Sequence, residues 1–148
     1  EKLVATNSTV KENLKTWLNG YKMINDTIDI LDAKIVNVGI EFRVMGQSEI
    51  NKYDVLSLAT SELQRAFDLD FDIGESISIT RIFKILNFIP GIVDTLDVRF
   101  TNRSGGLYSG YGFDIDRNTS ADGRLLMAPE DVIFEIKYPT KDIRGTIV

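Results

Sequence analysis

The stretch from residue 35 to residue 44 alternates between apolar and polar side chains along its whole length. Every second position carries one of the large apolar residues Val36, Val38, Ile40, Phe42 and Val44. The positions between them carry Asn37, Gly39, Glu41 and Arg43. A period of two predicts a β-strand with one buried face and one solvated face. Any fold for this chain must therefore cover one face of a sheet.

Three segments carry the 3.6-residue apolar spacing of a helix. Residues 8–19 form the first, with Asn7 or Ser8 as the N-cap, and we expect Trp17 on its apolar face to lie in the core. The second runs from about 49 to 67, with Ser48 as the candidate N-cap. A third follows Thr80 as its N-cap and ends at the dipeptide 90–91, since Pro cannot continue a helix.

Three shorter segments are predicted as strands. One lies near Ile77 and Ile79. The second follows the "PG" dipeptide, and its expected inward row is Leu96, Val98 and Phe100. The third spans residues 132–138, and a short tail, 139–148, closes the chain.

These elements predict an α+β fold in one domain spanning residues 1–148. We expect an open mixed sheet of about four strands, with two to three helices packed on one face, loosely ferredoxin-like in its layers. Because the sequence starts at Glu1 and enters almost directly into a helical pattern, we also expect a piece cut from a longer chain.

The composition removes several classes of function. There is no Cys and no His, which excludes thiolate nucleophiles, His general bases and the usual zinc sites. The net charge is −5 and no run of Lys or Arg offers a basic face for phosphates. No window approaches the ~20 apolar residues of a membrane span. We therefore expect no enzyme, no cofactor, no nucleic-acid partner and no membrane partner.

The segment 102–128 breaks the periodic pattern and forms a long loop rich in Gly, Ser, Asn and Asp. Its part "DIDRNTSADG" begins like a calcium loop at Asp114 and Asp116. Such a loop needs Gly at the sixth position and Glu at the twelfth, where this chain has Thr119 and Leu125. We predict a solvated loop with Asx turns and assign no metal ligand, while a weak cation site at Asp114 and Asp116 stays open.

The part "RSGGLYSGYG" has glycines but no Lys after them, so the phosphate-binding pattern of a P-loop is absent. Tyrosines give large contact areas at low entropic cost and are enriched in interfaces. We give equal weight to two hypotheses, that this loop contacts another protein and that it makes no such contact. The candidate contact residues are Leu107, Tyr108, Tyr111 and Phe113.

Three stretches together resemble a known family. They are "NLKTWLNGYKMINDTIDILDAKIVNVGIEFRV", "SISITRIFKILNFIPGIVDTLDVRF" and "APEDVIFEIKYPTKDIRGTIV". They resemble the baseplate wedge proteins of contractile-tailed phages, within the baseplate J-like family. The long loop carries little of this resemblance, so no role is transferred to it.

The resemblance implies a structural virion protein that joins wedges into the baseplate ring. It also implies that residues 1–148 are the C-terminal part of a larger subunit. It implies partners of two kinds, other copies of the chain and other baseplate wedge proteins, and a location in the virion tail after assembly in the host cytoplasm. It brings no catalytic residues. The alternative is a calcium- or ligand-binding adhesion module that uses the 102–128 loop.

Overall fold

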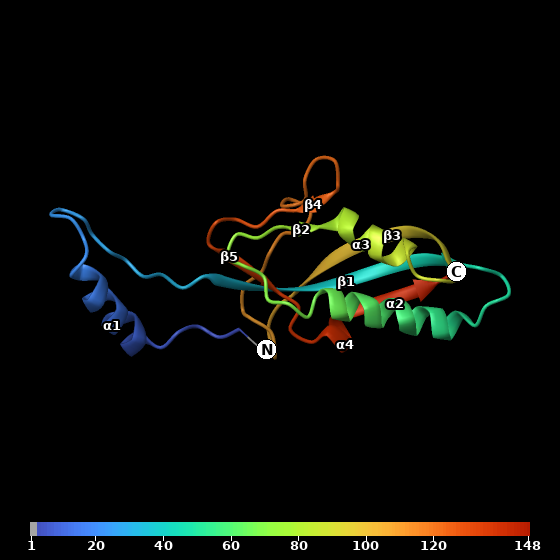
Figure 1. The fold of residues 1–148 in the computed structure, drawn as a ribbon, viewed down its shortest axis with the longest axis horizontal. Helices are drawn as coiled ribbons and strands as arrows, with labels where there is room; N and C mark the ends of the chain where they lie inside the picture. The colour runs from blue at the N-terminus through green and yellow to red at the C-terminus, as the bar shows by residue number, and fades with distance from the viewer. Residues whose placement is uncertain (1–2) are drawn as a thin grey trace.

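The computed structural model describes residues 3–148, and Figure 1 shows its elements. The helices are α1 (Ser8–Asn19), α2 (Lys52–Ala66), α3 (Ile79–Asn87) and the single turn α4 (Pro139–Asp142). The strands are β1 (Lys34–Gly46), β2 (Ile77–Ser78), β3 (Ile92–Arg103), β4 (Leu125–Leu126), β5 (Val132–Glu135) and β6 (Ile143–Ile147). Among these residues, no helix is long and apolar enough to cross a lipid bilayer.

Strand β1 is the centre of the main sheet. β3 pairs with it antiparallel on one edge, from Asn37 to Gly46. On the other edge β5 pairs parallel with the first residues of β1, and β6 pairs parallel with residues 40–44. β2 and β4 form a small second sheet. The predicted α+β fold with a mixed sheet of about four strands is confirmed.

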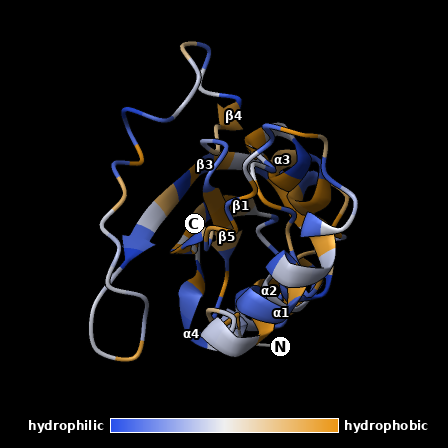
Figure 2. Cartoon of the chain, turned by 90° about the vertical axis from the view of Figure 1, so that its left-hand side faces the viewer, coloured by the Kyte–Doolittle hydropathy of each residue, from blue (hydrophilic) through white to orange (hydrophobic). Residues whose placement is uncertain are grey.

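Helices α2 and α3 cover one face of this sheet (Figure 2). Their inward residues are Val55, Ala59 and Leu63 on α2 and Ile79, Ile82 and Leu86 on α3. They pack with the buried row of β1, which is Val36, Val38, Ile40, Phe42 and Val44. The sequence period of β1 therefore correctly identifies the buried face of the sheet.

Helix α1 forms as predicted, and the Asn7 side chain caps it by accepting a hydrogen bond from the Thr9 N–H at 2.8 Å. It packs on no part of the sheet, however, and lies apart from the body of the domain (Figure 1). No residue of α1 is buried, and Trp17 is 60% exposed. The prediction that Trp17 lies in the core is wrong, because an apolar helix face does not identify the surface that covers it.

The inward row of β3 also differs from the prediction. Arg43 pairs with Asp97 while Val44 pairs with Thr95, so Leu96 is an extra residue in a β-bulge. The bulge turns Leu96 outward and Thr95 inward, whereas Val98 stays buried as predicted. The buried Thr95 hydroxyl donates a hydrogen bond to the Asn87 side-chain oxygen at 2.6 Å.

Two predicted helix starts are wrong by a few residues. Asn51, not Ser48, caps α2, and Ser78, not Thr80, caps α3. In each case the side-chain oxygen accepts a hydrogen bond from a backbone N–H in the first turn, which is the interaction that favours Asn and Ser at this position.

The C-terminal tail is structured. The strand predicted over 132–138 stops at Glu135, Pro139 begins the turn α4, and residues 143–147 return to pair with β1 as β6. At Gly145 this pairing leaves no room for a side chain. A Cβ there would overlap the ring of Phe42, which is buried.

We therefore expect Gly145→Ala to lower the free energy of unfolding by roughly 1–3 kcal/mol, since it overpacks the core against Phe42. Urea unfolding followed by circular dichroism measures this. Gly110→Ala is the matched control, because a Cβ at Gly110 meets nothing within 4 Å. Adding Phe42→Leu should recover part of the loss, and equal stabilities of the two alanine variants would contradict the packing of β6.

Candidate functional site

The loop that follows β3 wraps around one end of the main sheet. Residues that pair across strands share a face, so Asn37, Arg103 and Glu135 lie on the face opposite the helices. The loop first covers this open face, where Ser109 contacts Asn37. It then passes to the helix-covered face, where the ring of Phe113 packs edge-on against Phe134 with centroids 5.4 Å apart. Figure 2 shows the loop on the side of β3 away from the helices.

A buried amide fixes the first part of the loop. Asn37 is fully buried, and its side-chain oxygen accepts a hydrogen bond from the Ser109 N–H at 2.7 Å. Its side-chain NH₂ donates to the carboxylate of Glu135 at 2.8 Å. The second Glu135 oxygen accepts from the Leu3 N–H at 2.7 Å. The amide thus connects β1, β5, the loop and the N-terminal segment.

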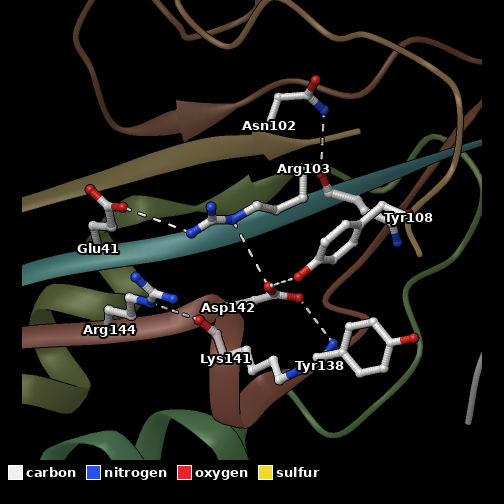
Figure 3. Close-up of polar contacts among 9 residues, drawn as sticks. Glu41, Asn102, Arg103, Tyr108, Tyr138, Lys141, Asp142 and Arg144 are labelled. Carbon is white, nitrogen blue, oxygen red and sulfur yellow. Dashed lines mark hydrogen bonds and ion pairs between the residues drawn. The ribbon is translucent and has the colours of Figure 1, made fainter. Parts of the chain in front are cut away.

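A buried carboxylate, that of Asp142, fixes the same loop through Tyr108 (Figure 3). Asp142 is 1% exposed and accepts hydrogen bonds from the Tyr108 hydroxyl at 2.6 Å and the Tyr138 N–H at 3.0 Å. The Arg103 guanidinium lies 3.9 Å from the same carboxylate. The hydrogen bond to Asp142 raises the pKa of the Tyr108 phenol above its ordinary value. These donors and the cation offset the cost of burying a charge.

The four candidate contact residues have two different environments. Tyr108 and Phe113 are half-buried and hold the loop to the domain through Asp142 and Phe134. Leu107 and Tyr111 are 68% and 51% exposed, so their side chains lie at the surface. Only Leu107 and Tyr111 of this set are therefore free to contact another molecule without unpacking the loop.

The acidic stretch 114–123 forms turns. The Asp114 carboxylate accepts from the Arg117 N–H at 3.1 Å, and the Asp122 carboxylate accepts from the Ser120 hydroxyl at 2.5 Å. That second bond lowers the pKa of Asp122 below its ordinary value. Within residues 3–148, no three acidic, His or Cys side chains are placed to hold a metal ion. Arg124 links this stretch to β4, which pairs with β2.

Sequence reasoning assigned Asn37 to a solvated face and placed Asp142 in a tail, so both buried polar groups were missed. One feature of the sequence could have indicated that part of this face is covered. The polar row of β1 changes from the charged Glu41 and Arg43 to the uncharged Asn37 and the side-chain-free Gly39. A Cβ at Gly39 would lie 2.9 Å from the Asp142 carbonyl oxygen, so the small residue marks the covered part of the open face.

The rest of the open face holds a shallow hollow of about 420 Å³ lined with charged residues of both signs. Arg99 and Asp97 form an ion pair there at 2.7 Å. Glu41 lies opposite Arg99 on β3 and Arg144 on β6. The charges therefore neutralise one another across the strands.

No protein-family model matches this chain, and no curated protein matches it.

We expect Tyr108→Phe to lower the free energy of unfolding by roughly 1–3 kcal/mol, because it removes a hydrogen bond to a buried carboxylate. Tyr111→Phe, which removes a hydroxyl from an exposed ring of the same loop, should leave stability unchanged. Urea unfolding of the two variants gives the comparison. Equal losses from both would contradict the anchoring role of Asp142.

We also expect calorimetric titration with Ca²⁺ to show no saturable heat, because Asp114 and Asp122 already accept hydrogen bonds in their own turns. Asp116→Ala is the matched variant, and it should give the same titration as the unsubstituted chain. Tight binding that disappears in Asp116→Ala would instead support the calcium-binding alternative.

Proposed function

We propose that this chain is a structural virion protein, the oligomerising domain of a phage tail baseplate wedge subunit that joins wedges into the baseplate ring. The observation that carries the proposal is helix α1. It has an apolar face at helical spacing, yet it buries no residue in this chain. A helix of 12 residues is marginally stable alone in water, so a partner surface is the natural source of its stability.

The exposed apolar residues are typical of a protein that functions by contact with other proteins. They include Val10, Leu14 and Trp17 of α1, and Leu107 and Tyr111 of the loop. By contrast, the buried carboxylates of Glu135 and Asp142 accept hydrogen bonds from the loop, from β1 and from backbone N–H groups. Their part is to hold the fold, and we propose no catalytic role and no cofactor for this domain.

The resemblance of three stretches to wedge proteins supplies the partners in this proposal. They are other copies of the same chain and the other wedge proteins of the baseplate. The proposed location is the tail baseplate of the virion, reached after assembly in the host cytoplasm.

Sedimentation velocity over a concentration series tests the self-association. We expect the average mass to rise above the 16.7 kDa of one chain as the concentration increases. High salt should weaken this little, because the exposed surfaces that carry the proposal are apolar. A chain that stays monomeric at high micromolar concentration would contradict a contact between copies of this domain.

A further inference from the structure

Strand β3 forms one edge of the main sheet (Figure 1). It pairs with β1 on one side, and within residues 3–148 no segment pairs with its other side. The strand is 12 residues long and contains no Pro. An unpaired edge of this length presents a row of backbone donors and acceptors to any strand that approaches it. The free edge of β3 is therefore a candidate surface for contact with an extended chain.

Hydrogen bonds on the other side of the sheet show which residues of β3 face the free edge. The N–H groups of Lys34 and Gly46 in β1 bond to the residues just before β5 and just after β6. Because backbone groups alternate in direction along a strand, the even residues of β1 face β5 and β6, and its odd residues face β3. Arg99 pairs with an odd residue of β1, so its backbone bonds to β1. Val98 and Phe100 therefore point their N–H and C=O groups toward the free edge.

The side chains beside Val98 carry opposite charges on the open face of the sheet. The side chains of Asp97 and Arg99 are 45% and 77% exposed and form the ion pair at 2.7 Å described above. That pair joins Oδ2 of Asp97 to Nε of Arg99. Oδ1 of the carboxylate and the two terminal nitrogens of the guanidinium remain free for a second charged group. An acidic and a basic group thus flank a residue whose backbone faces the free edge.

The charges of β3 favour one register for antiparallel pairing with a second copy. With Val98 opposite Val98 of the other copy, each Asp97 lies opposite an Arg99. A shift of two residues in one direction places Asp97 opposite Asp97, and in the other direction Arg99 opposite Arg99. A shift of one residue exchanges the buried face with the open face. In the centred register the sign of charge alternates from Arg43 through Asp97 to Arg99 and Glu41 of the other copy, since these residues already pair across β1 and β3.

We propose that β3 pairs with β3 of a second copy, antiparallel about Val98, so that two main sheets become one continuous sheet. This inference rests on the self-association in the proposed function and assigns it to the edge of the sheet. Backbone hydrogen bonds supply the affinity, and the charges select the register. A second copy is the occupant because the edge is complementary to itself, which is the condition for a two-fold contact. Such a contact joins copies in pairs, so a ring needs a second, different contact.

Charge reversal at the two exposed positions tests the register. Asp97→Arg should weaken the self-association measured by sedimentation velocity by ~10-fold or more, because like charges then face each other across the contact. Arg99→Asp should do the same. An equimolar mixture of the two variants should associate as tightly as the unsubstituted chain, since each copy then faces the opposite charges of the other. Asp70→Arg is the matched control, because Asp70 is exposed and lies outside β3.

Hydrogen exchange of the backbone amides tests the edge itself. In the dilute monomer the N–H groups of Val98 and Phe100 face no partner strand, so we expect them to exchange faster than the N–H of Arg99, which bonds to β1. Exchange at Val98 and Phe100 should slow by ~10-fold or more as the concentration rises through the association measured by sedimentation. The N–H of Arg99 is the internal control and should change less over the same range.

Each contrary result has a separate meaning. Association that neither charge reversal weakens, with unchanged exchange at Val98 and Phe100, overturns the β3 contact but leaves the proposed function standing. A mixture of the two charge variants that associates no better than either variant alone overturns the register and the contact built on it. Slow exchange at Val98 and Phe100 in the dilute monomer shows that the chain covers its own edge, and this also overturns the contact. A monomer at every concentration overturns both the contact and the proposed function.

Discussion

The backbone pairing of β1 is the constraint on which the rest of the domain depends. This strand pairs with β3 along one edge and with β5 and then β6 along the other, so it forms backbone hydrogen bonds on both edges. Its register also sets the position of every neighbouring side chain. A slip of one residue would exchange Ile40 and Phe42 in the core for Glu41 and Arg43. The alternation of the sequence therefore fixes both the core and the open face.

The open face of the sheet has two parts, one exposed to solvent and one covered by other segments of the chain. Glu41 and Arg43 lie in the solvated part, where charges of opposite sign face each other across the strands. Asn37 and Gly39 lie in the part that the loop and α4 cover. A buried amide without partners would destabilise the fold, so the loop position is set by the hydrogen bonds that Asn37 needs. The loop is thereby a part of the domain, and the exposed positions Leu107 and Tyr111 are presented on a fixed base.

The predictable elements were those with a strong local period. β1, α2 and α3 each bury a regular apolar row in this chain, so pattern and packing agree. β6 carries only a short and weak pattern, because Gly145 takes the inward position between Ile143 and Ile147 without supplying an apolar side chain. It pairs with β1 at an edge that β5 leaves vacant. The bulge at Leu96 is likewise a property of the pair β1–β3 and not of either segment. Of the candidate site, the sequence indicated the loop and its aromatic residues, whereas the buried partners Asn37 and Asp142 depended on tertiary pairing.

Trp17 shows most clearly that an apolar helix face predicts burial without identifying the surface that provides it. The apolar face of α1 predicts burial with the same logic as the face of α3, which packs on the sheet through Ile82 and Leu86. The difference is that this chain supplies no cover for the apolar face of α1. Because a helix as short as α1 is marginal in isolation, its folding is thermodynamically linked to any contact that its apolar face makes. Changes that weaken α1 as a helix therefore weaken any such contact, even where they leave Trp17 itself in place.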